Sequence, residues 1–224
     1  MSEIITPLKN EHPKRILWET IIVLLISTIP FIFFPSLKGI GIFIPVLYVL
    51  VERWIRKRSW TDFGIRPKRF FHDLRSQFFL VILVAVVIQV GVVLVANWFF
   101  PEFLEHITAR LPFVIGGSWI PIIVSLFFAT FVEEFVYRGL FQQRFSWFMP
   151  TSLAILSISF IFALLHIAPG IWFVILVDVL LIFVDSIIYG LIFARSHNLL
   201  VAWFAHFLAD VVALIMMVGV VRGL

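Results

Sequence analysis

Residues 119–148 read WIPIIVSLFFATFVEEFVYRGLFQQRFSWF, an apolar run that carries two adjacent carboxylates, Glu133 and Glu134, and an arginine, Arg138. A charged side chain at the centre of a membrane helix costs on the order of 2.5–3.5 kcal/mol, so these groups need a specific role. If the segment is helical, Glu134 and Arg138 stand four residues apart, in the order that favours an ion pair within one helix. Glu133 points about 100° away around the helix, which leaves its carboxylate available for chemistry.

The composition excludes an ordinary soluble protein. Of the 224 residues, 62% are hydrophobic and only 13% are charged. Apolar runs of about 20 residues can cross a bilayer as helices. We find such runs at residues 16–34, 37–55, 77–100, 119–148, 151–168, 171–194 and 198–221. The sequence therefore predicts an all-α, polytopic membrane helix bundle of about seven transmembrane helices around a buried polar cavity.

The basic residues indicate the orientation of the chain in the membrane. The connection between the second and third runs contains Arg53, Arg56, Lys57, Arg58, Arg66, Lys68, Arg69 and Arg75. Because short cytoplasmic connections are enriched in Lys and Arg, we place this one, and with it the N-terminus, on the cytoplasmic side. Seven spans then put the C-terminus outside. The net charge of +4 is concentrated beside the membrane, so we predict no nucleic-acid partner.

Further ionisable residues lie inside the later apolar runs. His166 is in the fifth run, and His206 and Asp210 stand four residues apart in the seventh. Together with Glu133 and Glu134, these groups are least costly when they all face one shared cavity. Asp178 and Asp185 share one face of the sixth run, and the sequence assigns no role to them.

A carboxylate and imidazoles in a partly dry cavity can move protons to and from a water molecule. A histidine N–H, a carboxamide or a protonated acid can stabilise the oxyanion that forms when water attacks an amide. Two His and one or two carboxylates could equally bind Zn²⁺ with one open position. The chain contains no H-E-x-x-H motif, and no nucleophilic Ser or Cys lies in a recognised signature.

Three motifs, in order along the chain, resemble those of the CPBP intramembrane proteases, also called the Abi or type II CAAX prenyl protease family. They are E-E-F-V-Y-R at residues 133–138, F-A-L-L-H at 162–166 and H-F-L-A-D at 206–210. The family patterns are EExxxR, FxxxH, and HxxxN or HxxxD. D-F-G-I-R at 62–66 is similar to a phrase that precedes the family's core. The resemblance covers about residues 118–212.

This resemblance implies an intramembrane endopeptidase that acts on hydrophobic or lipid-anchored substrates, such as prenylated CAAX tails or leader-bearing peptides. Glu133 and His166 would activate water, while His206 and Asp210 would stabilise the oxyanion. We read Glu134 and Arg138 as a structural ion pair. A glutamate-dependent mechanism without a cofactor is favoured. The zinc-dependent alternative would use His166, His206, Glu133 and Asp210 as ligands.

The chain divides into an N-terminal membrane scaffold, residues 1–117, and a catalytic core, residues 118–224. We expect an integral, multi-pass protein of a bacterial cell membrane, in contact with membrane lipids and a lipidated or hydrophobic peptide. Two other classes remain open. A proton-coupled transporter would also line a cavity with Glu, His and Asp, and a family member without catalysis could act as an immunity or scaffold protein.

Overall fold

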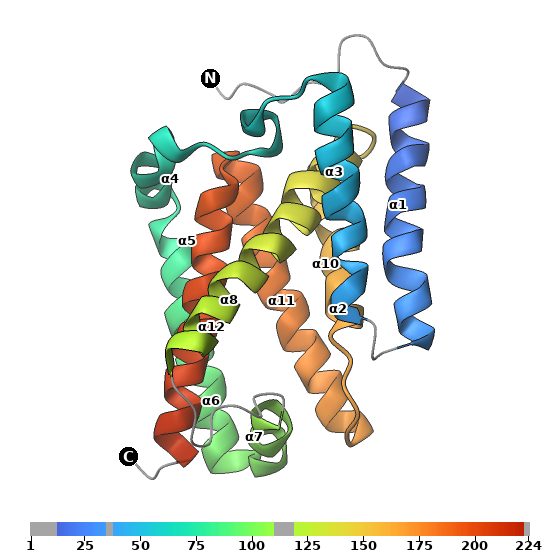
Figure 1. The fold of residues 1–224 in the computed structure, drawn as a ribbon. Coiled ribbons are helices and arrows are strands. Elements are labelled where there is room, and N and C mark those ends of the chain that lie inside the picture. Colours follow the sequence, from blue (N-terminus) through green and yellow to red (C-terminus); the bar gives the residue numbers. More distant parts are fainter. Residues whose placement is uncertain (1–12, 35–37, 110–118, 222–224) are drawn as a thin grey trace.

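The computed structural model describes residues 13–34, 38–109 and 119–221. All regular secondary structure in these ranges is helical (Figure 1). The first part contains α1 (Pro13–Phe33), α2 (Lys38–Gly41), α3 (Phe43–Arg56), η2 (Trp60–Phe63), η3 (Pro67–Arg69), α4 (Phe70–Ser76), α5 (Phe78–Ile82), η4 (Leu83–Ile88), α6 (Gln89–Phe99) and α7 (Pro101–Thr108). The second part contains α8 (Trp119–Glu134), η5 (Phe135–Gln142), α9 (Gln143–Phe145), α10 (Thr151–Leu165), α11 (Trp172–Ser196) and α12 (Leu199–Val221).

Four continuous helical segments among the described residues are long and apolar enough to cross a membrane. They are Phe78–Phe99, Trp119–Phe145, Trp172–Ser196 and Leu199–Val220. The all-helical prediction is confirmed, but the count of seven spans is not. The second predicted run is divided into α2 and α3, and α10 is an apolar helix of only 15 residues. The extreme N-terminus, residue 37 and the predicted domain boundary at 117/118 lie outside the described residues.

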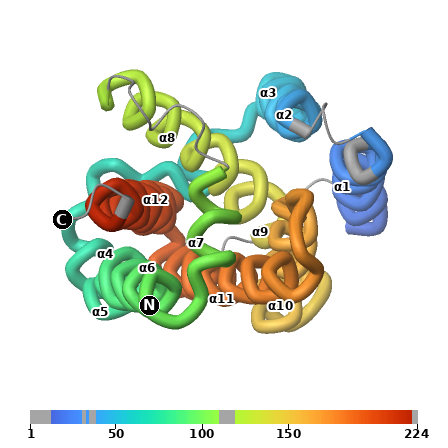
Figure 2. Tube along the Cα trace, turned by 90° about the horizontal axis from the view of Figure 1, so that it is seen from below, coloured from blue at the N-terminus to red at the C-terminus, as the bar shows by residue number. Residues whose placement is uncertain are grey.

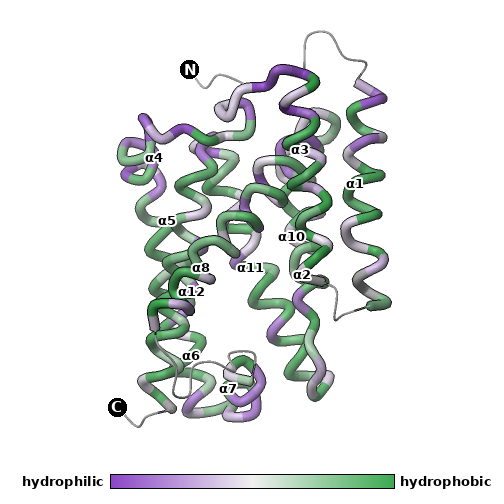
Figure 3. The backbone as a smooth tube through the Cα atoms, viewed as in Figure 1, coloured by the Kyte–Doolittle hydropathy of each residue, from purple (hydrophilic) through white to green (hydrophobic). Residues whose placement is uncertain are grey.

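The long segments run alternately between two ends of the bundle (Figure 1). The connection from α3 to α5 lies at the upper end of this view, and α7 lies at the lower end. Hydrophilic residues concentrate at the upper end, around η2, η3 and α4, while the long helices are mostly hydrophobic (Figure 3). The basic connection thus forms a polar cap on one end of an apolar bundle.

Helix α12 has the most extensive packing of the long helices. It contacts α8, η4, α6 and α11, and the view along the bundle shows α1 and α3 on the far side of α8 (Figure 2). Small buried residues on α12, Ala202, Ala205 and Ala209, allow these neighbours to approach closely. Its polar residues are therefore held among helices from both halves of the chain.

The D-F-G-I-R stretch joins the polar cap to the core. Phe63 is fully buried against Phe135, with ring centroids 5.9 Å apart. Gly64 has a positive φ of 82°, and an added Cβ would lie 2.7 Å from the Phe193 ring, so only glycine fits this turn. The Leu199 N–H donates to the Gly64 carbonyl at 2.8 Å. This turn fixes the junction between α11 and α12.

A buried ion-pair network attaches the N-terminal helices to the later helices. Arg144 of α9 pairs with Glu52 of α3, and its guanidinium also donates to the Tyr48 hydroxyl at 2.8 Å. Arg56 bridges Glu52 and Glu19 of α1, at 2.7 and 2.8 Å. Because Glu52 and Arg144 are almost fully buried, each needs the other to offset its desolvation cost. The network anchors α1 and α3 at the upper end of the bundle.

The segment that follows α6 contains a helix. The described part of the connection between the third and fourth apolar runs is formed mainly by α7. His106 of α7 lies 3.5 Å from Asp178 of α11 and packs so closely on Gly170 that an added Cβ would meet its ring at 2.7 Å. Helix α7 therefore contacts α11 at the lower end of the bundle, and Asp178 belongs to this contact.

Candidate active site

The acidic pair lies where the fourth long segment changes from an α-helix to a π-helix. Helix α8 ends at Glu134, and the π-helix η5 continues from Phe135 to Gln142. A π-turn widens the helix locally and is common at functional sites. The predicted ion pair nevertheless forms, with Arg138 Nε 3.1 Å from Glu134 Oε2, and both side chains are fully buried.

Helix α11 holds the polar face of η5. The Arg138 guanidinium donates to both the backbone carbonyl and the hydroxyl of Ser186, at 2.9 and 2.8 Å. One turn further along, the Gln142 amide donates to the Gly190 carbonyl at 2.9 Å. An added Cβ at Gly190 would lie 2.8 Å from Gln142 Oε1, so the small residue is what permits this contact. These bonds fix the rotation of η5 and thereby the direction of Glu134.

His206 of α12 lies between the carboxylates. Its Nδ1 is 2.9 Å from Glu134 Oε1, and its Nε2 is 3.8 Å from both Glu133 Oε2 and Asp210 Oδ1. Because an ionised carboxylate only accepts hydrogen bonds, Nδ1 carries a proton and donates to Glu134. The Tyr189 ring stacks on the imidazole at 4.6 Å. Nε2 is therefore directed toward Glu133 and Asp210.

The charges of this cluster do not balance. Glu133, Glu134 and Asp210 are three carboxyl groups, and the cations paired with them in this cluster are Arg138 and, when protonated, His206. Full ionisation would leave one uncompensated negative charge among largely buried groups, which is costly. Glu134 contacts both cations and is the least exposed of the three carboxyl groups, with a side-chain exposure of 0% against 26% for Glu133 and 37% for Asp210. Glu133 and Asp210 are thus the more accessible carboxyl groups of the cluster.

His166 approaches from the end of α10. It is the C-cap residue of that helix, and its Nδ1 lies 2.7 Å from the Phe162 carbonyl. Because a carbonyl accepts, Nδ1–H is the donor, so Nε2 is the nitrogen that can accept a hydrogen bond in a neutral ring. Phe162 also packs its ring on His166, 4.4 Å between centroids. The F-A-L-L-H motif therefore sets both the tautomer and the orientation of its histidine.

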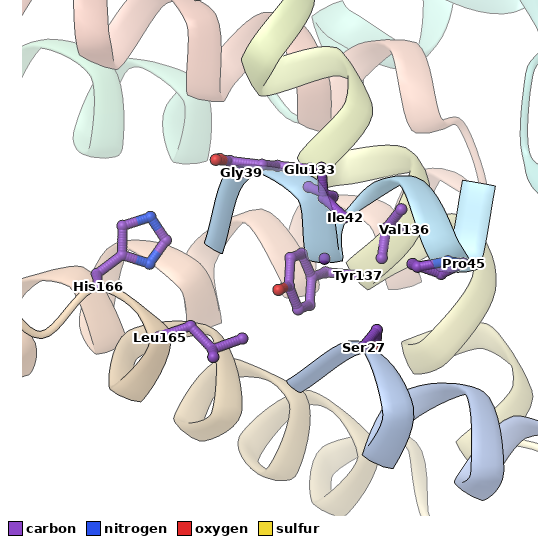
Figure 4. Close-up of a pocket in the computed structure, with 10 residues that line it drawn as sticks. Ser27, Gly39, Ile42, Pro45, Glu133, Val136, Tyr137, Leu165 and His166 are labelled. Atoms are coloured by element: carbon purple, nitrogen blue, oxygen red, sulfur yellow. The ribbon is translucent and has the colours of Figure 1, made fainter. Parts of the chain in front are cut away.

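Glu133 and His166 line one pocket of about 200 Å³ (Figure 4). Val136, Tyr137 and Leu165 complete the wall that surrounds these two residues. On its other side Glu133 faces His206. The structure thus places Glu133 between the pocket and the His206 cluster, and it brings together side chains from α8, α10 and α12.

Several residues that support this site had no role assigned from the sequence. Ser186 and Tyr189 hold Arg138 and His206 as described above. Asp185 accepts a hydrogen bond from the Gln89 amide at 2.8 Å, which joins α11 to the start of α6. Helical periodicity places residues 185, 186 and 189 on one side of α11. That pattern exists in the sequence, but only the packing of α6, η5 and α12 reveals its partners.

Metal ligation requires a different arrangement from the one described. Within the described ranges, no group of three or more His, Asp or Glu side chains is arranged to hold a metal ion. His206 Nδ1 is already engaged by Glu134, so only Nε2 would be available to a metal. The residues in their present positions do not fit a zinc site, and no step below passes through a metal.

Comparison with known protein families matches residues 115–212 to the family described as Type II CAAX prenyl endopeptidase Rce1-like. No curated protein and no solved structure matches the chain significantly. The matched segment contains all three motifs quoted above. The family match and the four long apolar helices together identify the chain as an integral, multi-pass membrane protein. Residues 115–212 thus match the Rce1-like family of type II CAAX prenyl endopeptidases, the family whose motifs the sequence resembles.

Proposed function

We propose that this protein is an intramembrane endopeptidase that hydrolyses a peptide bond in a membrane-associated substrate, either a prenylated CAAX-type tail or a leader-bearing peptide. The position of Glu133 carries the proposal. Its carboxylate shares a pocket with His166 and lies 3.8 Å from His206, so it can serve both a water molecule and the imidazole. The family in general consists of membrane proteases, which supports this reaction class.

In the proposed first step, a water molecule in the pocket is held by Glu133 and by Nε2 of His166. Glu133 removes a proton from the water, and the hydroxide oxygen forms a bond to the carbonyl carbon of the scissile peptide. His166 is suited to orient the water because its Nδ1–H is engaged by the Phe162 carbonyl, which leaves Nε2 as the acceptor. The chemistry requires no covalent intermediate with the protein.

The negative charge that develops on the carbonyl oxygen would be stabilised by His206. When Nε2 of this residue is protonated, it can donate to the oxyanion, while Glu134 holds Nδ1 and balances the imidazolium charge. Asp210 lies beside the same nitrogen and can orient it or, if protonated, donate a second hydrogen bond. The C–N bond then breaks as Glu133 returns its proton to the leaving amine.

The test is cleavage of a fluorescent prenylated CAAX-type peptide by the purified protein in lipid nanodiscs. We expect Glu133→Gln and His166→Ala each to lower the rate by about 10²-fold or more, in the range typical of a lost acid–base group. Glu102→Gln, at an exposed position on α7, serves as the matched control. Wild-type rates in both site variants, with unchanged melting, would reject the proposal.

A further inference from the structure

The pocket beside Glu133 has a second wall that comes from outside the family segment. Ser27 of α1, Gly39 and Gly41 of α2, and Ile42 and Pro45 at the start of α3 line it. These residues face Glu133, Val136, Tyr137, Leu165 and His166 (Figure 4). The family match begins only at residue 115, so the side of the pocket opposite the proposed catalytic residues belongs to the N-terminal helices.

Gly39 differs from the glycines that serve close packing. An added Cβ at Gly39 would meet no heavy atom within 4 Å, whereas at Gly190 or Gly64 it would clash at less than 3 Å. The φ angle of Gly39 is not positive, so the backbone does not require glycine there either. Neither packing nor backbone conformation therefore explains the absence of a side chain. What the absence provides is open space in the wall of the pocket.

The surroundings of Gly39 define what could occupy that space. Ile42, Pro45, Val136 and Leu165 make the neighbouring surface largely apolar, and Glu133 and His166 supply the polar end. A volume of about 200 Å³ is below the roughly 300–1,000 Å³ of typical small-molecule sites. It suits one or two residues of a peptide better than a whole lipid anchor.

We propose that Gly39 is a specificity-determining residue, whose missing side chain makes room for an apolar side chain of the substrate next to the scissile bond. The inference rests on the proposed function, because it takes the bond that Glu133 attacks as the reference point. The N-terminal helices would thus select the substrate residue, while α8, α10 and α12 carry out the reaction.

The first experiment compares Gly39→Leu with Gly91→Leu. Gly91 on α6 also has no heavy atom within 4 Å of an added Cβ, so it is a matched control away from the pocket. Leucine favours helix over glycine, so neither change should destabilise its helix. Two prenylated peptides are used, with either Ala or Leu beside the scissile bond.

We expect Gly39→Leu to lower kcat/KM for the Leu peptide by about 10-fold or more and to spare the Ala peptide, since a filled pocket rejects extra methylene groups by about 10–200-fold. Gly91→Leu should stay within about 2-fold for both. A merely structural effect would lower kcat/KM equally for both peptides. Equal losses, or no loss, in Gly39→Leu would overturn the inference.

A second experiment measures binding without cleavage. Because the chain has no cysteine, Gly39→Cys can be labelled selectively with a maleimide in a Glu133→Gln background. The uncut Leu peptide should slow labelling at position 39 but not at the exposed control Ser59→Cys. Protection without any wild-type cleavage would reject the proposed function and keep the site. Cleavage without protection would reject the site and keep the function.

Discussion

Nδ1 of His206 lies 2.9 Å from Oε1 of Glu134, and this contact joins α12 to the acidic pair of α8. The other oxygen of the same carboxylate lies 3.1 Å from Arg138 Nε. Glu134 therefore does more than pair with its own helix. It fixes the tautomer of His206 and leaves Nε2 of that ring for Glu133, Asp210 or a substrate.

Replacement of Glu134 should damage both stability and activity. Glu134→Ala leaves the Arg138 guanidinium buried without its carboxylate, and loss of one partner of a buried pair costs about 3–5 kcal/mol. We expect a lower melting temperature and a lower yield of folded protein in detergent. Glu133→Gln should melt like the wild type, because Glu133 is partly exposed and its contact with His206 Nε2 is long, at 3.8 Å. Similar melting temperatures for the two variants would contradict this division of roles.

Asp210 separates two mechanisms. If it orients His206 or donates a hydrogen bond to the oxyanion, a carboxamide of the same shape can replace it. Asp210→Asn should then keep most of the activity, whereas Asp210→Ala should lose about 10²–10³-fold, as for one oxyanion donor. A proton acceptor or a metal ligand needs the carboxylate itself. If Asp210→Asn and Asp210→Ala lose activity equally, and both melt at the wild-type temperature, the result would therefore favour an ionised or metal-bound Asp210.

Metal dependence can be measured directly. We predict that the purified protein cleaves its peptide without stoichiometric metal, because Glu133 and His166 can activate water by proton transfer alone. Elemental analysis gives the zinc content per chain, and activity is measured before and after chelation. Zinc near one per chain, with activity lost on chelation and restored by zinc, would establish the alternative set of His166, His206, Glu133 and Asp210 as ligands.

The orientation in the membrane can be tested with single cysteines. The upper end carries the basic connection, and α7 lies at the opposite end (Figure 1). We predict that the basic end faces the cytoplasm of a bacterial cell. In intact cells an impermeant maleimide should label Glu102→Cys on α7 and spare Ser59→Cys in the connection. The reverse pattern would invert the topology, and a membrane-permeant reagent controls for access to both sites.

Asp73, in the polar cap, should make a pH-dependent contribution to the stability of the folded protein. Burial opposes ionisation of this residue, but hydrogen bonds from His72 and Asn198 and the charge of Arg69 outweigh it and lower its pKa below the ordinary 3.8. A carboxyl group with a lower pKa in the folded protein than in the unfolded chain stabilises the fold at pH values above its unfolded-state pKa. This stabilisation is lost as the pH falls through the folded-state pKa.

Asp73→Asn should therefore lower the melting temperature at pH 5, and the difference should shrink below about pH 4, where the wild-type carboxyl becomes protonated. The mutation keeps the size of the side chain but removes the charge that Arg69 and the two hydrogen-bond donors require. Thermal melts of both proteins across this range provide the measurement. A difference that grows toward acid pH would show that the sign of the shift is wrong.

The sequence by itself determined the class of the protein, the family that its motifs resemble and the candidate site residues. Long apolar runs require helices in a membrane, since lipid offers no partner for backbone polar groups. Rare ionisable residues inside such runs identify the candidate site because each is costly there. The Glu134–Arg138 pair followed from helical spacing alone. None of this information depends on how the helices pack.

Only the tertiary structure decided which groups meet. The contact of His206 with Glu134 spans 72 residues, and the support of Arg138 by Ser186 spans 48, so no local periodicity contains them. The π-turn after Glu134, the division of the second apolar run and the helix α7 also depend on packing. The same holds for Gly39, which lines one pocket with Glu133 and His166 only because the N-terminal helices pack beside the later ones. Distances between helices are set by the side chains that fill the space between them. Those side chains come from several segments, so no single segment of the sequence specifies the arrangement.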